Sequence, residues 1–261
     1  MHKNEIKKIS IYLSIFILIY CVMNYIPFSS FMNTTAYLIF RFSVYVLLVF
    51  FVIFMKHKYK IEVEKPHQEL HYFSLLPLLV PCFTELIYCI IIDAETNPNF
   101  NGLVLSAEIV IDLLDSIFED IIFVDVMIAL LFDIFSYKVG RNLFTMVLAS
   151  IIFTVIRSYV FISRGLVYGG FTLLITFVVT FTCCYLAIYF DSPLIPIFFH
   201  FLFNVSNFVI APHVFTYDIE LNYYMMNIFC LVFLMLYTNL LLAISYRLNK
   251  KHHLWKKERL S

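Results

Sequence analysis

The chain has 261 residues, of which 62% are hydrophobic and only 14% are charged. A soluble domain of this length does not need so much apolar surface, so the composition indicates an integral membrane protein with several spans. The formal net charge is zero. The placement of the charges along the chain is therefore more informative than their sum.

Eight apolar segments are each close to the roughly 20 residues that a helix needs to cross a bilayer. In chain order the predicted spans are Ile9–Ile26, Ala36–Met55, Tyr72–Ile92, about Ser116–Phe135, Leu143–Phe161, Phe171–Tyr189, Pro193–Ile210 and Ile228–Ser245. The first resembles a signal peptide, but it is long and lacks a small-residue cleavage site, so we expect it to stay uncleaved. Leu103 to Asp115, ahead of the fourth span, is a candidate amphipathic lead-in at the membrane surface. We predict an all-α polytopic fold in a single integral-membrane domain, residues 1–261.

The basic residues predict the orientation in the membrane. Fifteen of them fall on one side of the eight-span arrangement, and Arg164 alone falls on the other. The fifteen are Lys3, Lys7, Lys8, Lys56, Lys58, Lys60, Lys65, Lys138, Arg141, Arg247, Lys250, Lys251, Lys256, Lys257 and Arg259. Because positive charge is retained on the cytoplasmic side, both termini are expected in the cytoplasm of a multi-pass protein of the cell membrane. The basic C-terminal tail is typical of an anchor at an anionic lipid surface, and we expect no nucleic-acid binding.

Five carboxylates share one face of the segment that contains the fourth span: Glu108, Asp112, Asp115, Glu119 and Asp133. An ionised carboxylate in hydrocarbon is costly, so this face must contact protein, a water-filled cavity or the headgroup layer. An interfacial or packing role explains Glu108, Asp112 and Asp133 well. Glu119 is followed by Asp120 and then by an apolar run, which predicts that this pair lies at depth and marks a functional site.

Few other polar residues lie within the predicted spans: Arg41, Glu85, Arg157, His200 and Asn204. His200 and Asn204 are four residues apart and share a helix face, although such a pair alone is more often a packing unit than a site. At about 1.5 Å per residue, Glu119, Arg157 and this pair lie at overlapping depths on three helices. Since buried charges need partners, we expect a shared polar pocket. Arg41 and Glu85 either form a second pair or join the first.

The polar residues occur in three short motifs on successive predicted helices. The first is Glu119-Asp120-x-x-x-Val124, and the second is Phe-x-x-x-Arg, which ends at Arg157. The third is His-x-x-x-Asn, which begins at His200 and follows a Pro-x-x-Pro pair. Each motif alone is short, so the order and spacing carry the information.

This pattern resembles the CPBP family, also called the Abi or CAAX-protease-like family, which includes the type II CAAX prenyl endopeptidases. The family motifs are Glu-Glu-x-x-x-Arg, Phe-x-x-x-His and His-x-x-x-Asn or Asp. The third is intact here, whereas Asp120 and Val124 replace the second acid and the Arg of the first motif, and Arg157 replaces the His of the second. The resemblance covers about residues 108 to 210.

The resemblance implies peptide-bond hydrolysis inside the membrane. Glu119 would act as general base on a water molecule, and His200 and Asn204 would stabilise the oxyanion, with Asp120 and Arg157 lining the site. A metal role has also been proposed in the family. Here only Glu119, Asp120 and His200 remain as ligands, so we expect no cofactor.

Arg157 conflicts with this chemistry. A guanidinium is neither a base nor a metal ligand. Beside Glu119 it would hold the carboxylate ionised, or bind it through both oxygens and block the water site. If Arg157 instead stabilises an oxyanion, a slow enzyme results.

We therefore predict a catalytically impaired bacterial pseudoprotease that acts as a membrane scaffold or as an immunity or surface-display factor. Its partners would be membrane lipid and a membrane-protein or peptide client. The first alternative is an active glutamate-dependent intramembrane endopeptidase that cleaves a membrane-bound or lipidated peptide. The second is an ion-coupled transporter, which the row of acids suggests. The six cysteines lie in apolar segments without CxxC spacing and are expected to be buried.

Overall fold

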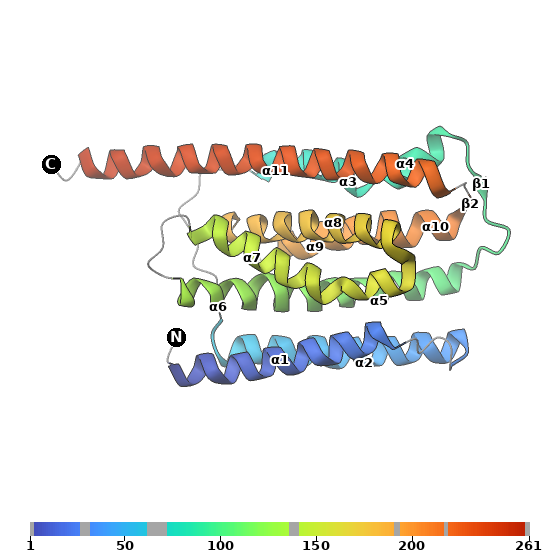
Figure 1. Cartoon of the computed structure of the whole chain (residues 1–261), viewed down its shortest axis with the longest axis horizontal. Coiled ribbons are helices and arrows are strands. Elements are labelled where there is room, and N and C mark those ends of the chain that lie inside the picture. The colour runs from blue at the N-terminus through green and yellow to red at the C-terminus, as the bar shows by residue number, and fades with distance from the viewer. Residues whose placement is uncertain are drawn as a thin grey trace.

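The protein is a bundle of helices that lie side by side along one long axis (Figure 1). This computed structural model describes residues 3–26, 32–61, 72–135, 141–190, 194–216 and 219–258. The elements in chain order are α1 (Lys3–Tyr25), α2 (Thr34–Lys58), η2 (Tyr72–Leu78), α3 (Leu79–Cys82), α4 (Thr84–Ile91), β1 (Glu95–Thr96), α5 (Gly102–Glu119), η3 (Asp120–Val126), α6 (Met127–Ile134), α7 (Arg141–Ile156), η4 (Arg157–Tyr159), α8 (Val160–Tyr189), α9 (Leu194–Asn204), η5 (Val205–Ile210), α10 (Ala211–Val214), β2 (Phe215–Thr216) and α11 (Ile219–Glu258).

Six helices within the described residues are long and apolar enough to cross a membrane, and a bent pair would make a seventh. The bent pair joins Ser74–Cys82 to Thr84–Ile91 at an angle of 56° and occupies the predicted third span. The predicted fourth span is not among these helices, because it carries too many carboxylates for its length. The all-α, multi-pass membrane fold is confirmed, and the count of eight spans stays a prediction.

Two connections differ from the sequence prediction. The surface lead-in and the fourth span form one run, because α5 continues through η3 into α6 without a break. The segment 162–170, expected to link the fifth and sixth spans, is helical and belongs to α8. Neither segment contains a proline that would end the helix, and the glycines at positions 165, 169 and 170 are tolerated within α8.

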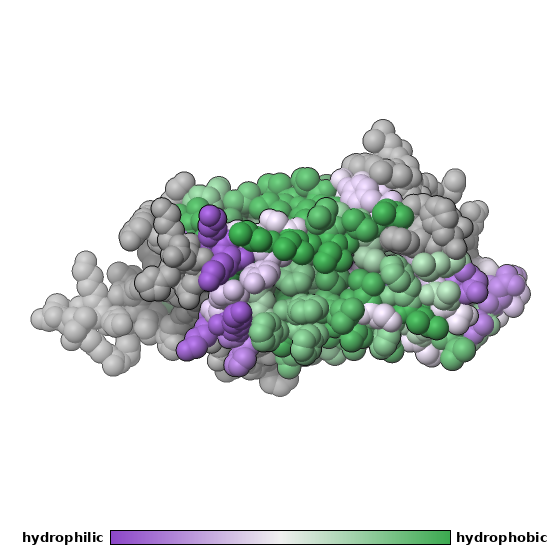
Figure 2. All heavy atoms as spheres, turned by 90° about the horizontal axis from the view of Figure 1, so that it is seen from below, coloured by the Kyte–Doolittle hydropathy of each residue, from purple (hydrophilic) through white to green (hydrophobic). Residues whose placement is uncertain are grey.

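The outer surface has the apolar character expected of a protein that lies in a lipid bilayer. Figure 2 shows a broad apolar band between hydrophilic residues at the two ends of the molecule. Large apolar side chains such as Leu18, Phe50 and Leu236 are exposed, as expected of a surface that faces lipid rather than water. The start of α1 and the end of α11 lie at the same end of the bundle, and the short β1–β2 pair lies at the other (Figure 1).

The predicted orientation requires that the amino-terminal and carboxy-terminal helices begin and end on the same side of the membrane, as they do here. Whether that end faces the cytoplasm stays a prediction. Of the fifteen basic residues behind that prediction, Lys65, Lys138 and Arg259 lie outside the described residues.

Helix α8 is the centre of the packing. It packs against α7, α9 and α11, and its buried residues include Cys183, Cys184 and Tyr185. On the opposite side of the site, α2 packs against α5, and Tyr20 of α1 is fully buried. All five cysteines other than Cys21 are buried, which agrees with their predicted role as small apolar side chains.

Two π-helical segments adjoin the motif residues. The first, η3, begins directly after Glu119, and the second, η5, begins directly after Asn204. A π turn inserts an extra residue into the helical repeat and is frequent at functional sites. At the start of η3 the adjacent side chains of Glu119 and Asp120 are both buried, and both face His200.

Candidate functional site

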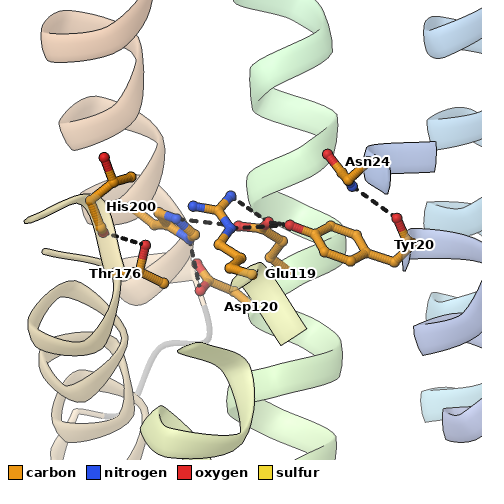
Figure 3. Close-up of polar contacts among 8 residues, drawn as sticks. Tyr20, Asn24, Glu119, Asp120, Thr176 and His200 are labelled. Atoms are coloured by element: carbon orange, nitrogen blue, oxygen red, sulfur yellow. Dashed lines mark hydrogen bonds and ion pairs between the residues drawn. The ribbon is translucent and has the colours of Figure 1, made fainter. Parts of the chain in front are cut away.

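Glu119 is the centre of a buried polar cluster at the point where α5 becomes η3. The hydroxyl of Tyr20 donates a hydrogen bond to Oε1 of Glu119, and Nη2 of Arg157 donates to the same oxygen at 2.6 Å. Nε of Arg157 also donates to the Tyr20 oxygen at 3.1 Å. Three helices that are far apart in the sequence therefore meet at one carboxylate oxygen (Figure 3).

Aromatic packing holds the two donors in place. The ring of Tyr20 lies 6.0 Å from Phe118, 5.8 Å from Phe123 and 6.4 Å from Phe153, measured between centroids. The guanidinium of Arg157 lies 5.1 Å from the centroid of Phe153, an arrangement in which the cation is attracted to the ring face. Because the tyrosine is fully buried among these rings, its hydroxyl has few directions to point other than toward Glu119.

His200 approaches the cluster from the opposite side. Its Nδ1 lies 3.1 Å from Oδ1 of Asp120, and its Nε2 lies 3.4 Å from Oε2 of Glu119. The contact with Asp120 is a hydrogen bond, whereas Oε2 of Glu119 has no hydrogen-bond partner and is only within ion-pair distance of the ring. If the ring is protonated, both carboxylates face a cation. The two carboxylates and the two cations then balance one another in the buried cluster, which lowers the cost of keeping them in hydrocarbon.

A cavity of about 350 Å³ adjoins the cluster. Its lining includes Arg157, His200 and Asn204, together with the carboxylates Glu108, Asp112 and Asp115. Glu119 is only 1% exposed and is not among the lining residues that the structure describes. Arg157 and His200 therefore stand between Glu119 and the space where a ligand or water would bind.

Most of the predicted site residues lie together. Glu119, Asp120, Arg157 and His200 are in direct contact, and Asn204 faces the same cavity one turn beyond His200. The pocket expected from overlapping depths is thus present in the fold. The catalytic roles that the resemblance assigns to these residues stay predictions.

The other polar residues of the membrane region have separate places. Arg41 pairs with Glu108 at 3.2 Å, beside the cavity. Glu85 is buried at the start of α4, where its backbone N–H donates to the Asn207 side chain at 3.0 Å. Asp133 is exposed on α6 away from the cavity. Glu108 and Asp112 were expected to be interfacial or packing residues, but both also line the cavity.

Sequence reasoning missed Tyr20 and Cys183. Tyr20 is one of 18 tyrosines in an aromatic-rich chain, and nothing in its local sequence points to Glu119, 99 positions away. Cys183 lies on α8 near Asp120 and His200, within a group whose possible ligand atoms are all within 4.8 Å of one another. Neither residue is part of a motif, so only the packing of the helices could reveal them.

The family resemblance raises a metal site for which Glu119, Asp120 and His200 are the remaining candidate ligands. The donors present do not fit such a site, because Oε1 of Glu119 is already bound by Arg157 and Tyr20. A fixed guanidinium at 2.6 Å would also repel a second cation at the same carboxylate. Asp120, Cys183 and His200 remain as a group of mixed ligand types, but both ring nitrogens of His200 face carboxylates.

Comparison with known proteins agrees with the motif pattern. Residues 101–206 match the family model described as type II CAAX prenyl endopeptidase Rce1-like. The matched segment contains α5, η3 and all three motifs, and it overlaps the predicted core of residues 108 to 210. No curated protein and no solved structure matches the chain. The predicted resemblance to the CAAX-protease-like family is confirmed.

Proposed function

We propose, from the likeness of residues 101–206 to type II CAAX prenyl endopeptidases, that this multi-pass membrane protein is a catalytically impaired homologue of those enzymes. The proposal rests on the hydrogen bonds and the burial of Glu119. Its Oε1 accepts hydrogen bonds from both Arg157 and Tyr20, and the side chain is closed off from the cavity.

A general base must reach the water molecule that it activates, either directly or through one hydrogen bond. Glu119 has only Oε2 left, and His200 lies 3.4 Å from that oxygen. The Arg157–Glu119 pair also fills the side of the carboxylate at which a water molecule would otherwise bind. These contacts support a retained cavity without efficient hydrolysis.

A protein that keeps the fold and the cavity of a protease can still hold a segment of another membrane protein or a lipidated peptide. We propose that the chain acts in the cell membrane as a scaffold, or as an immunity or surface-display factor. The apolar outer band and the polar cavity within it support a client that is itself embedded in the bilayer.

One observation favours an active, slow endopeptidase as the second candidate. Arg157, His200 and Asn204 all line the same cavity, and each can donate a hydrogen bond to a developing oxyanion. In that case another group would have to activate the water, because Glu119 is engaged.

The two candidates are separated by comparing the amino termini of membrane proteins in cells that carry the wild-type chain, a full deletion or the Glu119→Ala variant. If the chain is a scaffold, the deletion has a phenotype but loses no peptide ends, and Glu119→Ala at matched abundance functions as wild type. Peptide ends that are lost in the deletion but kept in Glu119→Ala would indicate the slow endopeptidase, in which another group activates the water. Peptide ends that vanish in both the deletion and the variant would show a working protease and overturn the proposal. An abundance-matched Asp133→Asn variant controls for the loss of a carboxylate on the same helical run, since Asp133 is exposed and outside the cavity.

A further inference from the structure

The wall of the cavity formed by α5 is acidic. Glu108, Asp112 and Asp115 line it, and of these only Glu108 has an ion-pair partner, Arg41, in the part of the chain that the structure describes. One oxygen of each aspartate, Oδ2 of Asp112 and Oδ1 of Asp115, is buried without a hydrogen-bond partner. Glu119 and Asp120 each have one such oxygen as well, but both also make ion pairs. Asp112 and Asp115 therefore differ from these neighbours in having no ion pair among the described residues.

The nearby basic groups are already engaged. Arg157 is bound to Glu119, and His200 lies between Glu119 and Asp120. Arg41 contacts Glu108 and lies near the rings of two tyrosines. Arg41 and Arg157 also attract Asp115 electrostatically, but among the described residues no basic side chain lies within ion-pair distance of Asp112 or Asp115. A buried carboxylate without a counterion is costly, so a cation from outside the chain would be attracted strongly.

A second observation also indicates a ligand. Asn204 lies on the cavity wall and is only 8% exposed, yet its side-chain amide makes no hydrogen bond to any residue that the structure describes. The amide atoms are not among the enclosed side-chain atoms that lack a partner, so they are open to the cavity and available to a ligand. Asn204, Asp112 and Asp115 therefore line one cavity, and each has polar atoms there that no described residue binds.

The spacing of the acids favours an organic cation over a metal ion. The three carboxylates occupy positions 108, 112 and 115, which spread them over about 10 Å of helix. Among the described residues, the group with ligand atoms close enough for a metal is Asp120, Cys183 and His200, and it includes neither Asp112 nor Asp115. The cavity volume of about 350 Å³ is within the range of small-molecule sites.

We propose that this cavity binds an organic ammonium group carried on a flexible chain, with Asp112 and Asp115 as its counterions and Asn204 as a polar contact. The ammonium is either that of a lysine side chain in a peptide or that of a free polyamine. The cation enters from the end of the bundle that carries β1 and β2, because Glu108 lies in the first turns of α5, which begins just after β1. Glu108 and its partner Arg41 are each 23% exposed. This site is independent of whether the chain hydrolyses peptides.

The test uses the full chain in detergent or nanodiscs, with thermal unfolding followed by a thiol-reactive dye that reports exposure of the buried cysteines. The probes are spermidine, the peptide acetyl-Leu-Lys-Leu-amide, the same peptide acetylated on the lysine side chain, and magnesium chloride. The variants are wild type, Asp112→Asn/Asp115→Asn, and Asp133→Asn as the matched control. The asparagines keep the shape of the side chains while removing their charge.

We expect at least one ammonium probe to stabilise wild type and Asp133→Asn equally, and the acetylated peptide to have no effect. The Asp112→Asn/Asp115→Asn variant should bind that probe about tenfold more weakly or worse, because removing one side of a buried charge pair is expensive. Stabilisation by spermidine alone identifies a free polyamine, and stabilisation by the lysine peptide identifies a side chain.

Three results would overturn the proposal. The first is an absence of stabilisation by either ammonium probe, which would leave the aspartates as protonated packing groups. The second is equal stabilisation of the double variant. The third is a response to magnesium that exceeds the response to both ammonium probes. A double variant that does not fold is replaced by the single Asp112→Asn and Asp115→Asn variants, each scored by the same criteria.

Discussion

Oxygen Oε1 of Glu119 accepts from a tyrosine on α1 and an arginine on η4, and this pair of contacts decides what the carboxylate is able to do. Tyr20 lies outside the residues that match the family model, so the amino-terminal helix contributes to the site directly. Arg157 occupies a position where the family has a histidine, and its contact with Glu119 replaces a titratable partner with a permanent cation.

Replacing Arg157 by Met should lower the free energy of unfolding by about 3–5 kcal/mol, because it leaves Glu119 charged and buried without its cation. The double variant Glu119→Gln/Arg157→Met removes both charges and should recover most of that loss. Both are measured by SDS titration of the purified protein. A double variant no more stable than Arg157→Met alone would show that the ion pair does not stabilise the fold.

Replacing Tyr20 by Phe should cost about 1.5–3 kcal/mol, the usual contribution of a hydrogen bond to a charged group. The matched control is Tyr25→Phe, since the Tyr25 hydroxyl bonds Ser158 at an exposed position and should cost less. Thermal unfolding of both variants in one detergent compares the two losses. Equal losses would mean that the Tyr20 hydroxyl has no special role at Glu119.

At the scale of elements, the site depends on departures from regular α-helix. The π segments η3 and η5 follow Glu119 and Asn204, and the bent pair α3–α4 packs against η5. Asn207 of η5 joins these parts: its Oδ1 accepts from the Glu85 N–H at the start of α4, and its Nδ2 donates to the Pro81 carbonyl at 3.0 Å. The first N–H groups of a helix have no partner within that helix, so Asn207 caps α4 from another element.

Replacing Asn207 by Leu should therefore destabilise the protein by about 1–3 kcal/mol, because the buried N–H of Glu85 loses its acceptor. Asn239→Leu is the control, since Asn239 is exposed on α11 and bonds only the Met235 carbonyl of its own helix among the described residues. Hydrogen exchange of α4, read peptide by peptide, should rise in Asn207→Leu and stay unchanged in the control. Unchanged exchange of α4 in both variants would contradict the capping role.

For the whole molecule, the sequence predicted the class of fold, the family resemblance and the meeting of Glu119, Arg157 and His200. These predictions succeed because hydropathy and buried charge impose strong constraints in a membrane. The contribution of Tyr20 and the acidic wall at Asp112 and Asp115 could not be predicted. Both depend on how each helix is rotated about its axis. That rotation cannot be predicted from a helix with apolar residues on all of its faces.

The predicted orientation is tested by cysteine labelling of intact cells. Asn99→Cys lies in the exposed loop between β1 and α5, and Lys58→Cys lies at the end of α2, at the opposite end of the bundle. A membrane-impermeant maleimide should label Asn99→Cys in intact cells and Lys58→Cys only after permeabilisation. The reverse pattern would place both termini outside the cell.

The central claim is that the engaged Glu119 leaves the cavity without efficient hydrolysis. It is tested most directly by incubating purified protein in liposomes with a set of lipidated and membrane-embedded peptides, followed by mass spectrometry of the products. We expect wild type and Glu119→Ala to give the same products as empty liposomes. Cleavage by wild type that Glu119→Ala abolishes would contradict the claim and establish a working protease.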